Sequence, residues 1–394
     1  IKVSQETILG KRMMEVLDIT NCRYCSEVSK TNRVDPIGSA PHIDYWLLVE
    51  FPQPWPTTIF TENPLIQQIF PLVKKLVLKR GVMVRPLAIA PDPDYSKPGY
   101  TRVIYYQRPA QQFAEYIKQE YLLPDAQTPS LVVALLNRLL GKAADLSQFM
   151  AYQQDTQALR EMLVCTHTQV DLACGRFGVP LYRHLRKTYG QPGQPLRVWQ
   201  SIHFGGHQFA PTLVDLPTGQ LWGHLEIGVL PQLIERNGDP QQMKFFYRGW
   251  TGVNKFEQIA EREAWMQEGW DWFTYPRTAR TRCKGLSGRK RWLYPILRRV
   301  PIKQLQIWLE RWTSDASWVD IDLTYQASQG CGHYQARVEE SGEVMTAHRS
   351  AAKATDKIAL APTKQYRVSH CRPITAASSN AGFERSVSVS LTSR

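Results

Sequence analysis

Residues 196–225 have the sequence LRVWQSIHFGGHQFAPTLVDLPTGQLWGHL. The first seven residues alternate like a β-strand, and the later part predicts a hairpin that closes at residues 217–219. Upstream, residues 159–167 predict a strand and residues 174–190 predict a helix, because apolar residues recur there every four positions. Residues 226–238 predict a short helix that ends at a glycine. This order of strand, helix, strand, loop, hairpin and helix predicts an α/β domain.

The same order of elements is typical of a thioredoxin-like domain. Before it, apolar runs of strand length around a helical pattern predict a second α/β domain, for which a thioredoxin-like fold is one option. After it, the pattern predicts helices and then strands, with a hairpin turn at Glu340-Ser341-Gly342. The predicted units are 1–125 (N-terminal α/β domain), 126–155 (helical connector), 156–240 (thioredoxin-like domain), 241–312 (helical and basic segment), 313–375 (β-rich extension) and 376–394 (disordered tail).

Two pairs of metal-ligand residues lie within the predicted thioredoxin-like domain. Cys165 and Cys174 have the spacing C-x8-C, and His203 and His207 have the spacing H-x3-H. Four soft or borderline ligands in pairs are typical of a metal site. Cys174 falls where the predicted helix begins, and the free N–H groups and dipole of a helix start favour a thiolate and an anionic cluster.

The loop between the two histidines contains Gly205 and Gly206, which we interpret as cofactor-binding positions. Glycines lack a Cβ and allow the backbone to approach a bulky cofactor closely. Zinc sites of the Cys2His2 type usually have a C-x2–4-C spacing, whereas a wider spread suits a [2Fe–2S] cluster, whose two irons need two ligands each. Cys165-Thr166-His167 matches half of a Rieske motif, but no C-x2-H follows, so a Rieske centre is excluded.

Several stretches resemble the sucrase/ferredoxin-like family: CTHTQVDLACGRFG at 165–178, the stretch at 196–225, and NCRYCSEVSK with YWLLVE near the N-terminus. The resemblance extends over most of residues 20–370. It implies a thioredoxin-like ferredoxin domain. In fungal members of the family, two cysteines and two histidines hold a [2Fe–2S] cluster, and that pattern maps onto Cys165, Cys174, His203 and His207.

The role that this resemblance implies is electron transfer in redox metabolism. We therefore expect an electron carrier rather than a catalyst. Sucrase activity is not supported, because glycoside hydrolysis needs two positioned carboxylates and the sequence singles out no such pair. The expected partner is an unidentified redox protein, whose surface is acidic if it docks on the basic part of this chain.

Cys22 and Cys25 form a C-x2-C pair in NCRYCSEVSK. One interpretation is a redox dithiol at a helix start, which would make the protein a thiol–disulfide oxidoreductase. The Trp-Cys-Gly-Pro context of thioredoxins is absent, and plain core cysteines are the other interpretation. A third functional hypothesis is a zinc-stabilised interaction module built on the Cys165 to His207 set.

The formal charge of +13 is concentrated in one segment. Residues 277–303 contain ten Lys or Arg residues and no Asp or Glu. The segment interleaves Trp292, Tyr294 and Ile296, so it predicts either an amphipathic helix that docks a partner or an anionic surface, or a solvated basic linker. No recognised nucleic-acid motif is present, so we expect no specific nucleic-acid binding.

No apolar stretch reaches the roughly 18 residues of a membrane span. The start of the sequence lacks the pattern of a signal peptide. Seven cysteines are too few for a disulfide scaffold, and their odd number favours free thiols or metal ligands. We therefore expect a cytoplasmic protein. Phosphate-binding loops and G-x-S-x-G nucleophile motifs are also absent from the sequence.

Overall fold

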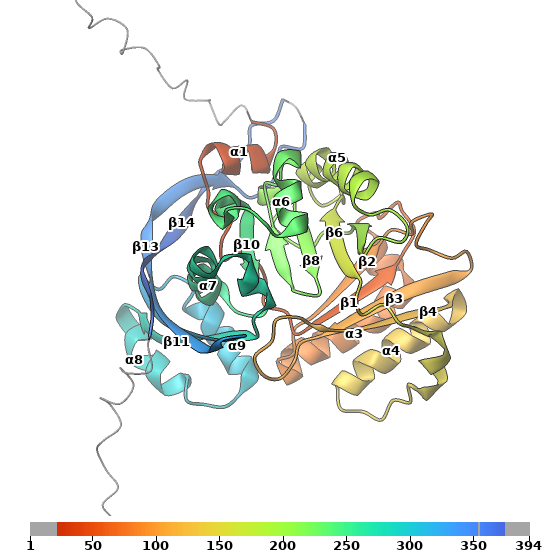
Figure 1. The fold of residues 1–394 in the computed structure, drawn as a ribbon, viewed down its shortest axis with the longest axis horizontal. Coiled ribbons are helices and arrows are strands. Elements are labelled where there is room, and N and C mark those ends of the chain that lie inside the picture. The colour runs from red at the N-terminus through yellow and green to blue at the C-terminus, as the bar shows by residue number, and fades with distance from the viewer. Residues whose placement is uncertain (1–21, 354, 375–394) are drawn as a thin grey trace, which may run out of the picture.

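The computed structural model describes residues 22–353 and 355–374 (Figure 1). The larger of its two sheets has ten strands in the order β10-β9-β8-β6-β7-β2-β1-β3-β4-β5. Helices and a mixed sheet confirm the predicted α/β class. In chain order the strands of this sheet are β1 (Tyr45–Glu50), β2 (Val84–Ile89), β3 (Tyr100–Gln107), β4 (Ile117–Pro124), β5 (Gln153–Gln154), β6 (Arg160–Cys165), β7 (Leu196–Ser201), β8 (Leu213–Leu216), β9 (Gln220–Trp222) and β10 (Tyr247–Trp250).

The larger sheet consists of two halves with the same order of elements. In the first half β1 and β2 are parallel, α2 (Ile59–Glu62) and α3 (Pro64–Lys75) connect them, and β3, β4 and α4 (Thr128–Leu139) follow. In the second half β6 and β7 are parallel around α5 (Leu172–Thr188), and β8, β9 and α6 (Leu230–Glu235) follow. The halves meet where β2 pairs with β7. The element order and the hairpin at 217–219 predicted for the second half are therefore confirmed.

The start of α5 is packed closely against the end of β6. Asp171 caps this helix, because its side chain accepts a hydrogen bond from the backbone N–H of Ala173. Gly178 faces β6, and a Cβ added there would lie 2.1 Å from the carbonyl oxygen of Cys165. The glycine therefore lets the helix approach the strand end on which the candidate site is built.

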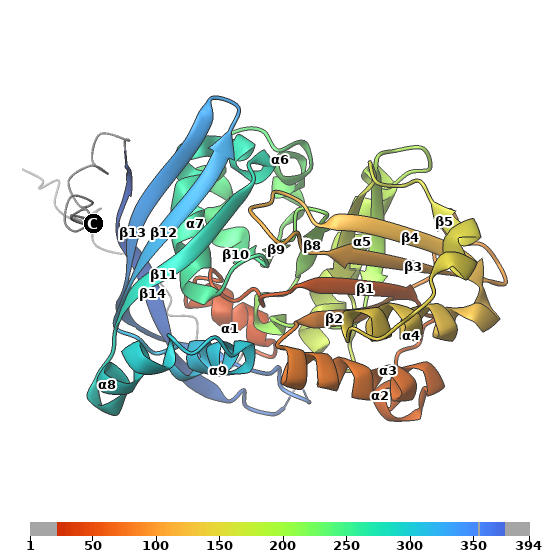
Figure 2. The same cartoon turned by 90° about the horizontal axis from the view of Figure 1, so that it is seen from below.

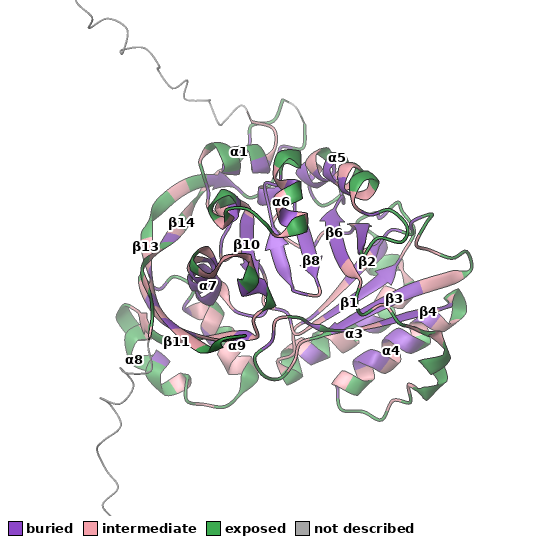
Figure 3. Ribbon diagram, in the orientation of Figure 1, coloured by how far each residue is buried: buried purple, intermediate pink, exposed green. Residues whose placement is uncertain are grey.

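The smaller sheet is antiparallel and curves around one helix, α7 (Lys255–Glu268), as Figure 1 shows. Most residues of α7 are buried, and the helix contacts all four strands (Figure 3). A short helix near the N-terminus, α1 (Cys25–Thr31), contacts the same sheet. The strands are β11 (Arg277–Gly285), β12 (Trp318–Ala327), β13 (Gly330–Ala347) and β14 (Leu360–Pro373).

Two expectations for the C-terminal part need correction. The predicted hairpin turn at Glu340-Ser341-Gly342 is wrong, because β13 continues through these residues with a bulge in its pairing to β14. Gly342 has φ of 128°, a conformation that glycine adopts without strain, so the glycine marks the bulge rather than a turn. The basic segment 277–303 is not one helix or linker: it forms β11, then α8 (Gly288–Leu297) and the approach to α9 (Lys303–Trp312). The predicted tail at 376–394 lies outside the described residues.

A buried ionic network joins the two halves of the larger sheet. The guanidinium of Arg197 on β7 donates to the carboxylates of Glu120 on β4 and Glu161 on β6. Arg102 and Lys118 add further cations to these two carboxylates. Burial opposes ionisation of Glu120, but these cations, Arg197 above all, lower its pKa to about 2. No helix of the described ranges is long and apolar enough to cross a membrane.

Candidate metal centre

The four predicted ligands come from three elements of the second half. Cys165 is the last residue of β6, and Cys174 lies in the first turn of α5. His203 and His207 follow the end of β7. Because β6 and β7 are parallel neighbours, their carboxyl ends meet at one edge of the sheet, where open α/β sheets usually bind ligands.

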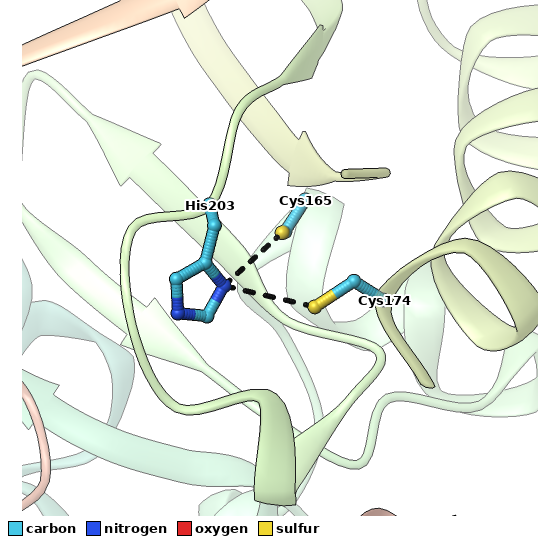
Figure 4. Close-up of side chains that lie close together, drawn as sticks. All are labelled: Cys165, Cys174 and His203. Atoms are coloured by element: carbon cyan, nitrogen blue, oxygen red, sulfur yellow. Dashed lines mark hydrogen bonds between the residues drawn. The ribbon is translucent and has the colours of Figure 1, made fainter. Parts of the chain in front are cut away.

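Cys165, Cys174 and His203 converge on one point (Figure 4). The Nδ1 atom of His203 lies 3.8 Å from the sulfur of Cys165 and 3.7 Å from the sulfur of Cys174. The three ligand atoms all lie within 4.8 Å of one another. Both cysteines are buried and His203 is half-buried, so this group combines two protected thiols with one accessible imidazole.

His207 lies next to this first group but belongs to a second group, which consists of Cys25, Asp171 and His207. Its Nδ1 atom is 3.3 Å from the carboxylate of Asp171 and 3.3 Å from the sulfur of Cys25. The ring centroids of His203 and His207 are 5.3 Å apart, so the two groups adjoin. The other ring nitrogen of His207, Nε2, has no hydrogen-bond partner among the described residues. A histidine held by a carboxylate at one nitrogen is the usual arrangement of a metal ligand that binds through the other.

Asp171 connects the second group to the C-terminal part of the chain. Its carboxylate accepts hydrogen bonds from the backbone N–H of Ser350 at 2.9 Å and from the Ser350 hydroxyl at 2.6 Å. Burial raises the pKa of Asp171, but the bonds from Ser350 and Ala173 and the neighbouring His207 lower it further than burial raises it. Asp171 is therefore ionised, and it can accept the Nδ1–H of His207.

The thiols of the centre differ in their acidity. Burial opposes ionisation of Cys165, yet hydrogen bonds from the Cys174 thiol and His203 bring its pKa well below the usual value. The same hydrogen bond to Cys165, together with burial, raises the pKa of Cys174. Burial, together with the charge of Asp171, raises the pKa of Cys25 to about 12. The first group thus favours one thiolate on Cys165, whereas Cys25 is protonated at neutral pH.

The two glycines of the histidine loop have different surroundings. Gly205 and Gly206 have φ of 102° and 81°, which a residue with a side chain rarely adopts. A Cβ on Gly206 would lie 2.2 Å from Nη2 of Arg248, whereas a Cβ on Gly205 would meet no atom within 4 Å. Gly206 therefore makes room for the guanidinium of Arg248, which donates to the carbonyl of Gly205 at 2.9 Å.

Two arginines from distant strands hold the backbone of this loop. Besides Gly205, the buried Arg248 of β10 binds the hydroxyl and carbonyl of Ser39. Arg85 of β2 donates to the carbonyl of His203 at 3.3 Å. Neither arginine pairs with a carboxylate in the described part of the chain, and burial lowers the pKa of Arg248 to about 10. A buried cation needs a compensating anion, and the nearby group that most readily supplies one is the thiolate of Cys165.

Sequence reasoning missed four residues of this centre. Arg85, Arg248 and Ser350 are far from the ligands along the chain and belong to no motif. Asp171 precedes a predicted helix, and its capping position was the one available signal. The sequence suggests Cys25 only as one half of a C-x2-C dithiol with Cys22, and the structure also places its sulfur next to His207 and Asp171. His167 is buried with Nε2 bonded to the carbonyl of Trp55, a structural role.

A mostly apolar cavity of about 510 Å³ lies beside the centre. Its wall includes Ser26 of α1, Phe177 and Pro180 of α5, and Ala210 and His224 near the histidine loop. Ser26 follows Cys25 directly, and Ala210 follows His207 by three residues. The cavity therefore brings solvent, or a bound molecule, close to the second group.

Comparison with known proteins identifies a family that this chain matches. A family model described as sucrase/ferredoxin-like matches residues 36–249, which is more than half of the chain. The matched region includes the four predicted ligands, Asp171 and both loop arginines, and it excludes Cys25 and Ser350. No curated protein and no solved structure matches the chain.

Proposed function

Because the chain belongs to the sucrase/ferredoxin-like family, we propose that it binds a [2Fe–2S] cluster and transfers electrons. The observation that supports this most directly is the convergence of Cys165, Cys174 and His203 at the carboxyl ends of β6 and β7. Two thiols and two imidazoles form a donor set that suits such a cluster. A bound cluster would supply one-electron redox chemistry.

Each of the four residues has an atom suited to this role. Cys165 and Cys174 would bind through sulfur, and His203 through Nδ1, which faces both sulfurs. His207 would bind through Nε2, because Asp171 holds its Nδ1. Cys174 lies in the first turn of α5, where the positive end of the helix dipole favours a thiolate ligand.

The two arginines of the loop, Arg248 and Arg85, favour the reduced form of the centre. Two thiolates and two neutral imidazoles add less negative charge than four thiolates do, so the reduction potential should exceed that of an all-cysteine ferredoxin. Arg248 and Arg85 add positive charge that no carboxylate neutralises, and this stabilises an added electron. We further propose that electrons are exchanged with a separate redox partner protein, which would approach the half-exposed histidines.

The two alternative functions rest on different residues. A Cys2His2 set also suits structural zinc, so metal content must decide between zinc and iron. A thiol–disulfide oxidoreductase needs a reactive thiolate, but burial raises the pKa of Cys25 to about 12. Because this high pKa keeps the Cys25 thiol protonated at neutral pH, it argues against Cys25 as an attacking nucleophile.

The decisive experiment is metal and sulfide analysis of anaerobically purified protein, with visible and EPR spectra of its oxidised and reduced forms. We expect two irons and two sulfides per chain and a reduced-state EPR signal typical of [2Fe–2S]. His203→Ala and His207→Ala should alter this signal or abolish it. The matched control is His184→Ala on α5, which removes a half-buried imidazole outside the centre and should leave the signal unchanged.

Two results would overturn the proposal. Stoichiometric zinc without iron would identify a structural zinc module. A protein that contains no metal, and remains colourless after reconstitution with iron and sulfide, would show that the four residues do not form a cluster site.

A further inference from the structure

Large apolar side chains are exposed on the two helices between β11 and β12. Trp292 of α8 is 77% exposed and Ile296 is 64% exposed. They are four residues apart, so they lie on the same face of the helix. Ile302 in the connection to α9 is 52% exposed, and Trp308 of α9 is 47% exposed. Exposed apolar residues that cluster in this way usually mark an interaction site.

Cations without acidic partners surround these side chains. The first carboxylate after Arg277 along the chain is Glu310, which pairs with Lys284, and Lys290 pairs with Asp315. The remaining exposed cations of the two helices form no salt bridge within the described residues. These cations are Arg289, Arg291, Arg298, Arg299, Lys303 and Arg311. The surface therefore combines protruding apolar groups with a positive field that the protein itself does not neutralise.

This surface continues onto the first half of the larger sheet. The helical turn η2 (Leu76–Arg80) ends the α3 helix and contacts α9, where the side chain of Gln304 donates to the carbonyl of Lys79. Leu78 is 60% exposed there, and Lys79 is also exposed. Figure 2 shows α8, α9 and α3 along one edge of the molecule. We call α8, residues 298–302, α9 and η2 together the α8–α9 face.

We propose that the α8–α9 face docks the protein on an anionic lipid bilayer. Tryptophan and isoleucine side chains can enter the boundary between head groups and acyl chains, while flanking arginines bind lipid phosphates. An acidic protein surface would also complement the cations and could bury the indole. The lipid is favoured because α8 combines exposed Trp292 and Ile296 with exposed Arg289 and Arg291, which is the composition of a helix that lies in a bilayer interface. The starts of α1 and α5, which hold the candidate centre, lie at the opposite end of the view in Figure 1. Docking through this face therefore leaves the centre accessible, and the inference does not depend on what the centre binds.

The test is flotation of the purified full-length chain with lipid vesicles. One set contains phosphatidylcholine alone, and the other adds phosphatidylglycerol. We expect binding to the anionic vesicles, weakening as salt is raised, and little binding to the neutral ones. Two double variants should each lower the partition coefficient about tenfold or more: Trp292→Ala with Ile296→Ala, and Arg298→Gln with Arg299→Gln.

The matched control removes two exposed cations from α5, as Arg183→Gln with Lys187→Gln, and should change binding less than about twofold. Circular dichroism and thermal unfolding establish that each variant is folded. The proposal is overturned if the chain binds neither kind of vesicle or binds both equally. It is also overturned if the Trp292 and Ile296 double variant binds vesicles as well as the parent chain does. A third contrary result would be a parent chain that forms a dimer and does not bind vesicles, together with a double variant that is monomeric, because the face would then be a dimer interface.

Discussion

The two halves of the larger sheet have the same topology but end their first strands differently. In the first half β1 ends at Glu50, whose carboxylate binds the hydroxyl of Ser96 and the backbone N–H of Arg102. In the second half β6 ends at Cys165, beside Cys174 and His203. In the first half the strand end therefore carries a carboxylate held by hydrogen bonds and a salt bridge, and in the second half it carries potential metal ligands. The comparison shows that both halves offer a sheet edge at which a ligand could bind. The residue at the end of the first strand decides whether that edge can hold a metal.

Two buried arginines, Arg102 of the first half and Arg248 of the second, differ in the same way. Arg102 in the first half pairs with the carboxylates of Glu50 and Glu120. Arg248 in the second half is equally buried but pairs with no carboxylate in the described ranges. An uncompensated buried cation costs stability unless an anion approaches it. Its presence beside Cys165 and Cys174 therefore marks the edge at which an anionic group is expected.

The largest expected effect comes from replacing the last side chain of β6, a candidate metal ligand, and the last side chain of β1, which is not one. Cys165→Ser should abolish iron binding, because an alcohol replaces a buried thiolate ligand. Glu50→Gln, at the equivalent position of the first half, should leave the iron content unchanged and lower the free energy of unfolding by about 2 kcal/mol, since it removes hydrogen bonds to a charged group. Iron analysis and denaturant unfolding of both variants measure the two effects. Full iron content in Cys165→Ser would contradict the assignment of this cysteine.

The second prediction compares His224, which is buried, with His42, which is partly exposed. His224, on the cavity wall, is bonded to the Ser29 hydroxyl, and burial with the nearby cations Lys30 and Arg248 lowers its pKa to about 4. Burial also lowers the pKa of His42 in the first half, but the charge of Asp44 opposes this. In the unfolded chain both imidazoles take up protons near pH 6.5. Between pH 6.5 and about 4 the unfolded state therefore binds more protons than the folded state, and stability falls as pH falls.

His224 should account for up to about 3 kcal/mol of this loss, which is the free energy of its pKa shift. The measurement is the free energy of unfolding as a function of pH for the parent, His224→Gln and His42→Gln. His224→Gln should flatten the profile between pH 6.5 and 4 more than His42→Gln does. Equal profiles for the parent and His224→Gln would show that this imidazole is not held neutral.

Sequence patterns predict those features that depend on residues close together along the chain. The element order of the second half follows from periodicity and turn residues, and the pairs Cys165/Cys174 and His203/His207 are visible as spacings. The contacts of the second group cannot be predicted from sequence spacing. Cys25, Asp171 and Ser350 come together only because α1 and the segment after β13 pack against the start of α5. A glycine after two polar residues occurs both in hairpin turns and in β-bulges, so this pattern cannot distinguish the bulge at Gly342 from a turn.

The smallest expected effect concerns the reduction potential of the centre. Arg248→Met removes the buried cation, retains much of its apolar volume, and eliminates the hydrogen bond to the Gly205 carbonyl. Because the cation stabilises an added electron, the potential should become more negative, by an amount equivalent to about 1–2 kcal/mol for one charge at an effective dielectric constant of about 20. Redox titration followed by EPR measures this shift, and Arg183→Gln on the surface of α5 is the control for a change in net charge alone. An unchanged potential in Arg248→Met, with the metal still bound, would show that this arginine positions the loop but does not affect the reduction potential. The difference between the paired Arg102 and the unpaired Arg248 would then be unrelated to electron transfer.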